Sequence, residues 1–312
     1  MDIEQQTYVI GVDIGGTHTR IGAVTSDGTL HFFLKRKTKD IVDVKDPIES
    51  LKRFLYEYIE LYVSGKKVLA VGMGFPSVVS KDKKRILTTT TMESLCNVNI
   101  VDPLQDYLKI PVYIDNDVNH LLKYEISKRN VMKDDIVLGF YIGTGFGNAI
   151  YLHDQFLSGK NGAAAELGHI PVYQNGDVCG CGNIGCVEVI ASGKRLVALH
   201  QEHFSDVPFE EIFTKCAHEK IIEDFIHALA IPIATEINIF DPHLVILGGG
   251  VVGMKNFPKE RLEEKVIQSC RRPFPAGGLN FEYAEDVNAA GVLGAASHIY
   301  DQLKRENVIK IG

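Results

Sequence analysis

The chain has 312 residues, of which 45% are hydrophobic and 23% charged, and 33 basic against 40 acidic side chains leave a net charge of −7. At roughly 100–200 residues per domain, this length predicts two domains or one large one, with a core that needs no disulfides. The composition argues against general disorder, and the acidic balance provides no basic face for nucleic acid. The negative net charge does not exclude a phosphate ligand, because main-chain amides and a metal can hold a phosphate whatever the net charge.

The sequence contains no signal for membrane insertion or secretion. No run of about 18 apolar residues is present, so no membrane span is expected. Residues 1–6 lack the basic start and apolar stretch of a secretory signal. We therefore expect a cytoplasmic protein, in which the dense spacing of three of the six cysteines indicates a metal site rather than disulfides.

The N-terminal part of the chain predicts the order β-β-β-α-β. The strands are expected over residues 8–13, 20–24, 30–34 and 68–73. Asp27-Gly28 is the turn of a hairpin between the second and third strands. A helix is expected over 47–63, where Leu51, Leu55 and Ile59 recur at helical spacing.

The middle of the chain repeats this pattern. A strand is expected over 112–114, a helix from Asp117, and two strands over 136–142 and 148–152 with glycines between them. A strand, a glycine turn and a second strand thus occur near 8–24 and near 136–152, which is a weak internal duplication. Further elements are a helix over 221–239 that Pro232 can kink, a strand over 244–247 and a final helix over 289–306.

Two glycine turns suit the binding of phosphate. They are Asp13-Ile14-Gly15-Gly16-Thr17 and Gly143-Thr144-Gly145-Phe146-Gly147. Glycines let main-chain amides approach a phosphate, the Thr17 hydroxyl can donate to it, and Asp13 can hold Mg²⁺ through water. The alternative is that each is a tight β-turn. Neither is a Walker loop or a dinucleotide fingerprint, because no Gly-Lys-Ser/Thr follows and no helix opens after the glycines.

Asp117 follows a strand and opens a helix. It can simply cap that helix, since aspartate is a favoured capping residue. The functional alternative is a base that accepts a proton from a substrate hydroxyl during phosphoryl transfer, a reaction in which positioning matters more than covalent help. The helix N-terminus favours the ionised carboxylate that a base requires.

His169, Cys179, Cys181 and Cys186 are spaced as ligands of a tetrahedral Cys₃His zinc site. Four protein ligands leave no open position, so the site is expected to be structural rather than catalytic. Glu166 and Glu188 flank this loop. They are either solvated surface charges or acceptors for sugar hydroxyls that the zinc loop preorganises.

These motifs resemble the ROK family (repressor, open reading frame, kinase) of the actin-like sugar kinase superfamily. The resemblance extends over nearly the whole chain. It rests on both phosphate turns, on residues 162–169 and 179–188, which resemble the family's signature and zinc loop, and on Gly248-Gly249-Gly250, which resembles the adenosine motif.

The resemblance implies an actin-like, ribonuclease H-like α/β fold of duplicated β-β-β-α-β-α domains with a cleft between them. The expected domains are residues 1–118, joined by the C-terminal helix at about 290–312, and residues 119–289, with the zinc loop 169–186. The implied activity is an ATP- and Mg²⁺-dependent hexose 6-phosphotransferase with Asp117 as the base. The residues expected to contact the sugar are Asn116, Asp117, Glu166, His169 and Glu188, and those expected to contact ATP are Asp13, Gly15, Gly16, Thr17, Gly143, Thr144, Gly145, Gly147, Gly248, Gly249 and Gly250.

D-Allose is the expected substrate, because residues 74–83 are similar to the corresponding loop of family members that phosphorylate it. Thr88–Glu93 stands where the family usually has Pro-Asn-Leu, whose asparagine binds sugar hydroxyls. The alternatives are a glucokinase, fructokinase or N-acetylmannosamine kinase and, from another class, a non-catalytic sugar-sensing regulator. Because the first phosphate motif begins at Asp13, the winged helix of the family's repressors is not expected. A homodimer that binds neither nucleic acid nor membrane is expected.

Overall fold

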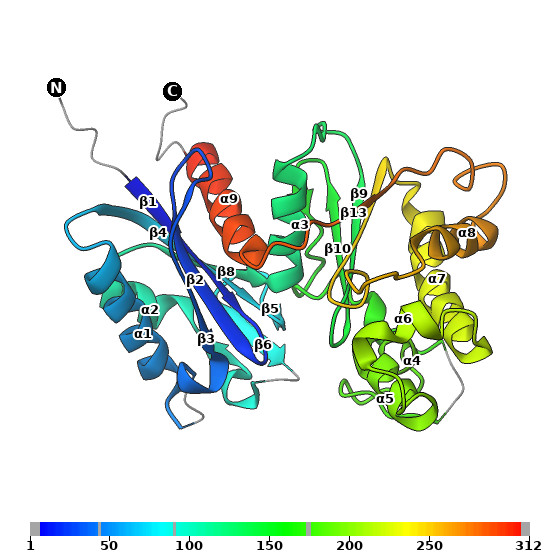
Figure 1. Ribbon diagram of the computed structural model, residues 1–312. Helices are drawn as coiled ribbons and strands as arrows, with labels where there is room; N and C mark the ends of the chain where they lie inside the picture. The colour runs from blue at the N-terminus through cyan, green and yellow to red at the C-terminus, as the bar shows by residue number, and fades with distance from the viewer. Residues whose placement is uncertain (1–6, 43–44, 90–91, 173–175, 307–312) are drawn as a thin grey trace. The chain divides into compact units, whose positions relative to one another are not determined.

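The computed structural model describes residues 7–42, 45–89, 92–172 and 176–306. The chain divides into two compact units, one with residues 1–130, 158–164 and 287–312 and the other with 131–157 and 165–286 (Figure 1). This division falls at other residues than the 118/119 and 289/290 boundaries expected from the motifs, which stay a prediction. Among the described residues, no helix has the length and apolar character needed to cross a membrane.

The first unit contains a five-stranded sheet in the order β3-β2-β1-β4-β8. Its strands are β1 (Thr7–Ile14), β2 (His18–Val24), β3 (Leu30–Lys37), β4 (Lys67–Phe75) and β8 (Val112–Asn116). The first three form an antiparallel meander, and β4 and β8 continue the sheet parallel to β1. The four strands predicted from the N-terminal pattern are therefore present, with β3 three residues longer than expected.

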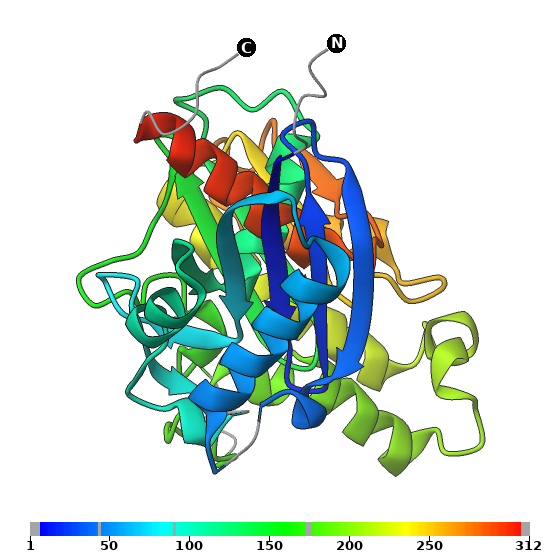
Figure 2. The same cartoon turned by 90° about the vertical axis from the view of Figure 1, so that its left-hand side faces the viewer.

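Helices cover both faces of this sheet, one in front of the strands and one behind them in the face-on view of Figure 2. Alternate side chains of β1 explain the arrangement: Ile10 packs in one cluster with α1 (Pro47–Tyr62) and α2 (Val101–Leu108), whereas Val9 packs with α9 (Ala290–Arg305). Gly11 permits the close approach of α9, because a Cβ there would lie 2.2 Å from the carbonyl oxygen of Val292. Helix α3 (Asp117–Ser127) packs on α9.

The remaining elements of this unit are short and were not expected from the sequence. They are a small sheet of β5 (Ser77–Val79), β6 (Arg85–Thr89) and β7 (Val98–Asn99), and the 3₁₀ helices η1 (Thr38–Asp40) and η2 (Glu93–Leu95). Helix α2 was likewise not expected.

The second unit repeats the same sheet topology in the order β11-β10-β9-β12-β13. Its strands are β9 (Val137–Ile142), β10 (Phe146–Leu152), β11 (Gln155–Phe156), β12 (Leu244–Gly248) and β13 (Phe281–Tyr283). The meander β9-β10-β11 is antiparallel, and β12 and β13 are parallel to β9, as β4 and β8 are to β1. The expected duplicated actin-like α/β fold is thereby confirmed.

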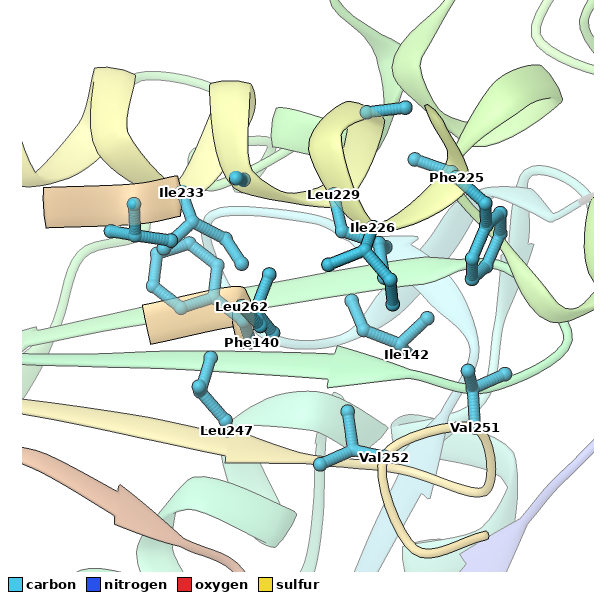
Figure 3. Close-up of a cluster of buried hydrophobic side chains, with 14 of the residues drawn as sticks. Phe140, Ile142, Phe225, Ile226, Leu229, Ile233, Leu247, Val251, Val252 and Leu262 are labelled. Carbon is cyan, nitrogen blue, oxygen red and sulfur yellow. The ribbon is translucent and has the colours of Figure 1, made fainter. Parts of the chain in front are cut away.

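One face of this second sheet packs against α7 (Lys220–Phe240) and α8 (Lys259–Ser269). Figure 3 shows Phe140 and Ile142 of β9 directed toward Ile226, Leu229 and Ile233 of α7. The helix expected over 221–239 is one continuous element that includes Pro232. The other helices of the unit are η3 (Leu167–His169), α4 (Val187–Ile190), α5 (Gly193–His203), η4 (Phe209–Glu211) and α6 (Ile212–Lys215).

Candidate functional site

The carboxyl edge of the first sheet brings two of the predicted motifs to neighbouring strands. Asp13 of β1 pairs in register with Gly74 of β4, and Gly74 pairs with Asp115 of β8. Asp117 follows two residues later, so the first glycine turn and the candidate base emerge from the same edge. Parallel strands commonly present ligand sites at this edge.

Asp13 forms an ion pair across the β1–β2 hairpin. Arg20 Nη1 donates to Asp13 Oδ2 at 3.0 Å, from the residue directly opposite on β2. Burial raises the pKa of the Asp13 carboxyl above its usual value, and the charge and hydrogen bond of Arg20 only partly oppose the rise. Arg20 was not expected as a site residue, although its place opposite Asp13 follows from the hairpin register.

The first glycine turn is held by bonds to its own backbone. The Gly15 amide donates to the His18 carbonyl at 3.0 Å, and the Thr38 hydroxyl donates to the Gly15 carbonyl at 2.6 Å. The Thr38 amide donates to the Thr17 carbonyl at 3.0 Å. The turn is thus braced from η1, which suits a loop that must present its amides in one geometry.

Asp117 is the first residue of α3, and the residue in the capping position is Asn116. The Val118 amide donates to Asn116 Oδ1 and to Asp117 Oδ1, each at 2.9 Å. Asn116 Nδ2 also donates to the Ser77 carbonyl at 3.2 Å, which ties the cap to β5. Because Asn116 has the capping geometry, capping alone does not account for an aspartate at position 117.

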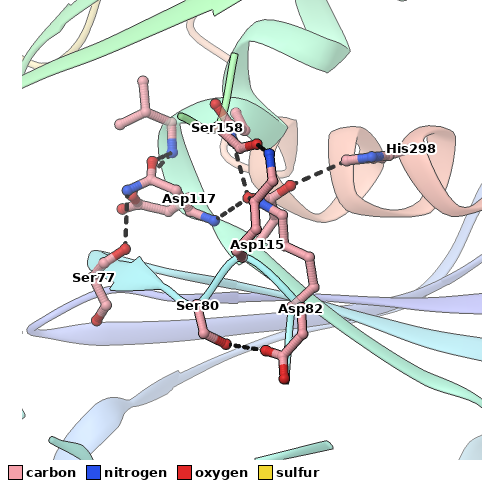
Figure 4. Close-up of polar contacts among 12 residues, drawn as sticks. Ser77, Ser80, Asp82, Asp115, Asp117, Ser158 and His298 are labelled. Carbon is pink, nitrogen blue, oxygen red and sulfur yellow. Dashed lines mark hydrogen bonds and ion pairs between the residues drawn. The ribbon is translucent and has the colours of Figure 1, made fainter. Parts of the chain in front are cut away.

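The carboxylate of Asp115 lies at the centre of a polar network beneath Asp117 (Figure 4). Its Oδ1 accepts from Lys83 Nζ at 2.6 Å, from the Asn116 amide at 2.7 Å and from Asn119 Nδ2 at 2.9 Å. His298 Nδ1 of α9 lies 3.8 Å from Oδ2. Burial alone would raise the pKa of Asp115, but the positive charge of Lys83 and its hydrogen bond leave that pKa below its usual range.

In the second unit, the two other glycine motifs also share one edge of a sheet. The turn 143–147 joins β9 to β10, and Gly248 at the end of β12 pairs with Tyr141 of β9. Gly249 has φ +91°, and a Cβ there would lie 2.6 Å from the backbone of Ile142. A side chain is therefore excluded where the backbones of these two motifs meet.

The N-terminus of α5 and a carboxylate from α4 both contact the turn 143–147. The Gly193 amide donates to the Gly143 carbonyl at 2.8 Å, and the Lys194 amide donates to the Thr144 carbonyl at 3.1 Å. Glu188 Oε2 accepts from the Phe146 amide at 3.1 Å. The predicted sugar residue Glu188 is thus also a support of the predicted phosphate turn.

The four predicted zinc ligands are brought together in the second unit. The ligand atoms of His169, Cys179, Cys181 and Cys186 all lie within 4.8 Å of one another. Cys181 Sγ is 3.7 Å from Cys186 Sγ, and Cys179 Sγ is 3.4 Å from His169 Nδ1. A tetrahedron with Zn–S bonds of about 2.3 Å has S···S edges of about 3.8 Å, so the donor set fits this ion.

The other ring nitrogen of His169 faces a predicted sugar residue. Nε2 lies 3.8 Å from Glu166 Oε2, while Nδ1 is directed toward Cys179. This arrangement suits an imidazole that binds zinc through Nδ1 and orients Glu166 through Nε2.

Lys83, His120 and His298 surround Asp115 and were not predicted as site residues. Lys83 ends the stretch 74–83, but the three residues lie on a turn, α3 and α9, so no local pattern shows that they meet around Asp115. Thr90 and Thr91, in the stretch that replaces Pro-Asn-Leu, lie outside the described residues.

Comparison with known proteins shows one family over almost the entire chain. The ROK family model matches residues 9–302. The glucokinase of Thermotoga maritima is 28% identical, covering 95% of this chain and 98% of its own. An N-acetyl-D-glucosamine kinase of Histophilus somni is 27% identical over 92% of this chain and 97% of its own.

A repressor and a solved kinase structure are also similar. The xylose repressor of Caldicellulosiruptor bescii is 27% identical over 95% of this chain but only 78% of its own. A crystal structure of a ROK glucokinase from Streptomyces griseus, in complex with glucose and AMPPNP, is similar with a TM-score of 0.73 and 26% identity. That likeness covers 93% of this chain and 98% of the other.

Proposed function

This chain belongs to the ROK family, and from that premise we propose that it is a kinase that transfers the γ-phosphoryl group of ATP to the 6-hydroxyl of a hexose. The observation that carries the proposal is the placement of Asp117. The residue opens α3 at the same sheet edge as the glycine turn 13–17, and Asn116 rather than Asp117 has the capping geometry.

Asp117 accepts the proton of the attacking hydroxyl. The N-terminus of α3 favours the ionised form of its carboxylate, which is the form that a base requires. As the O–P bond forms to the γ-phosphorus, the hydroxyl proton passes to Asp117 and ADP leaves with the electrons of the broken bond. Phosphoryl transfer depends mainly on such positioning and on charge stabilisation.

The glycine motifs are the proposed nucleotide contacts. In the first unit these are Gly15, Gly16 and Thr17, and in the second Gly143, Thr144, Gly145, Gly147 and Gly248–Gly250. Asp13, paired with Arg20, is the proposed residue to hold Mg²⁺ through water; the ion supplies charge neutralisation on the phosphates. Because Arg20 already shares this carboxylate, direct coordination is less favoured than a water-mediated contact.

The proposed sugar contacts are Asn116 and Asp117 in the first unit and Glu166, His169 and Glu188 in the second. We propose D-allose as the preferred substrate, because residues 74–83 are similar to the corresponding loop of family members that phosphorylate this sugar. We propose that a structural zinc ion, held by His169, Cys179, Cys181 and Cys186, fixes the loop 169–186. The fit of these four donors to zinc supports this proposal.

A coupled assay of ADP release tests the function and the substrate together. The panel is D-allose, D-glucose, D-mannose, D-fructose, N-acetylmannosamine and N-acetylglucosamine, each with Mg²⁺ and ATP. The proposal predicts sugar-dependent ADP release with the highest kcat/KM for D-allose. A higher kcat/KM for another sugar would overturn the substrate, and sugar-independent or absent ADP release would overturn the kinase.

The second candidate is a sugar-sensing regulator, favoured by the similarity to a xylose repressor. Such a protein binds its sugar without consuming ATP. Calorimetry that detects sugar binding, together with no ADP release for the same sugar, would favour it. The expected homodimer is tested separately by light scattering of the purified chain.

A further inference from the structure

We propose that Lys83 is a positioning residue for Asp117, acting through an ion pair with the buried carboxylate of Asp115. This inference rests on the proposed function, because it takes Asp117 as the base. It assigns a role to the last residue of the stretch 74–83, which lies on the β5–β6 turn and was not predicted as a site residue.

Asp115 connects three elements to the first turn of α3. Its Oδ1 accepts from the Asn116 amide at 2.7 Å and from Asn119 Nδ2 at 2.9 Å, which are the residues before and after the segment that contains Asp117. Lys83 Nζ reaches the same oxygen at 2.6 Å from the β5–β6 turn, and His298 of α9 faces Oδ2. Asp117 thus lies between Asn116 and Asn119, which both donate to Asp115 Oδ1.

Because Asp115 is buried, its ionised carboxylate needs the positive charge of Lys83. Asp115 is 4% exposed, and an ionised carboxylate without a cationic partner is costly at such a depth. The imidazoles that face it, His120 of α3 and His298 of α9, have pKa values lowered by burial, so they are neutral near pH 7. Lys123 of α3 is engaged with Asp301 at 2.6 Å, which leaves Lys83 as the cation on Asp115 among the described residues.

The turn that carries Lys83 is adapted to this contact. Lys83 has φ +55°, in the left-handed region that favours glycine, and its amide donates to the Ser80 carbonyl at 2.8 Å. Ser80 Oγ in turn accepts from the Arg85 amide at 2.9 Å. A lysine at a position where the backbone favours glycine indicates that the side chain itself is used.

The same cluster also offers metal donors, since Asp115, His120 and His298 each have a ligand atom within 4.8 Å of the others. The Lys83 ammonium group already contacts the Asp115 carboxylate, and its positive charge would repel a cation. The geometry therefore favours an internal ion pair over a metal site.

The test compares Lys83→Met with Lys84→Met in the full-length protein. Lys84 is the matched control: it is the next residue of the same turn and pairs with Asp102 at 2.7 Å, where both side chains are about half exposed. We expect Lys83→Met to lower kcat about 10- to 100-fold with the KM for ATP within about twofold of wild type. Lys84→Met should keep kcat within about twofold.

The pH profile of kcat separates positioning from general destabilisation. Without Lys83, burial would raise the pKa of Asp115, so the acid limb of the profile of Lys83→Met should move to higher pH. Lys83→Arg should restore most of kcat and the wild-type limb. If Lys83→Met does not fold, Asp115→Asn provides the same comparison, because its amide keeps the shape of the side chain and loses the charge.

Equal kcat values and equal acid limbs for Lys83→Met and Lys84→Met would overturn the proposal, as would an Asp115→Asn variant with wild-type kcat. A separate outcome identifies failure of the proposed function. If Asp117→Asn keeps wild-type turnover, Asp117 is not the base, whatever Lys83→Met does. If Asp117→Asn is inactive while Lys83→Met matches the control, only the role of Lys83 is wrong.

Discussion

Glu188 Oε2 accepts a hydrogen bond from the Phe146 amide at 3.1 Å, which places a carboxylate of α4 against the turn 143–147. Gly145 makes this contact possible, because a Cβ at that position would lie 2.1 Å from the same oxygen. A side chain at position 145 would therefore displace the Glu188 carboxylate from the turn. Glu188 thereby connects the predicted sugar-binding residues to the predicted nucleotide turn 143–147.

Gly145→Ala is expected to displace Glu188 and to lower kcat/KM for both ATP and sugar by about tenfold or more. The added methyl group cannot be accommodated without moving the carboxylate or the turn. Steady-state kinetics measures the effect, with Gly253→Ala as the control, because the nearest heavy atom to a Cβ at Gly253 is 3.5 Å away. Wild-type kinetics for Gly145→Ala would show that the Glu188 contact is not needed.

A buried pair in the core of the second unit predicts a pH dependence of stability. Glu236 of α7 is 3% exposed, and its Oε1 accepts from Asn148 Nδ2 at 3.3 Å. Burial raises the pKa of Glu236 from 4.5 to about 8, and the hydrogen bond from Asn148 only partly offsets the rise. The folded state therefore favours the protonated acid, so stability is full below pH 4.5 and is lost as the pH rises toward 8, by up to about 1.4 kcal/mol per unit.

Glu236→Gln should remove this dependence, because the amide keeps the shape and carries no charge at any pH. We expect its Tm to match wild type near pH 5 and to exceed it near pH 9, as measured by thermal unfolding across that range. Glu264→Gln, at an exposed position of α8, is the control and should follow wild type. If Glu236→Gln lost stability with pH as steeply as wild type, another group would be responsible.

The proposed zinc ion predicts a metal content of about one atom per chain. Cys181→Ser should lose that metal and lower the Tm by about 5 °C or more, since binding energy contributes to folding. Elemental analysis and thermal unfolding measure both effects. Cys96→Ser, at an exposed cysteine outside the cluster, should retain the zinc; a wild-type protein that is stable, active and free of zinc would refute the site.

The elements that the sequence predicted correctly are those with strong local signals. Strands such as β1 and β9 are long and apolar, and the turns that follow them contain clustered glycines. The duplicated order could therefore be recognised in both halves. The small sheet β5-β6-β7 escaped prediction because strands of two to five residues have too few positions to show a period.

In the site, too, the residues that could be predicted are those marked by the sequence next to them. Asn116 and Asp117 are marked by the end of a strand and the start of a helix, and the zinc ligands by their spacing. Lys83 and Asp115, by contrast, are 32 residues apart in the sequence and meet only because the β5–β6 turn folds back onto β8. Lys83 ends the stretch 74–83 and Lys84 follows it, but no local pattern shows that the two lysines pair with different aspartates.

The turnover of Asp117→Asn with ATP and the best sugar of the panel shows whether Asp117 is the base. The amide preserves the size of the side chain at the start of α3 but cannot accept the proton. If Asp117 is the base, kcat falls by about 10²- to 10⁴-fold, while calorimetry shows ATP affinity near that of wild type. A variant that binds ATP normally and turns over at the wild-type rate would show that Asp117 is not the base.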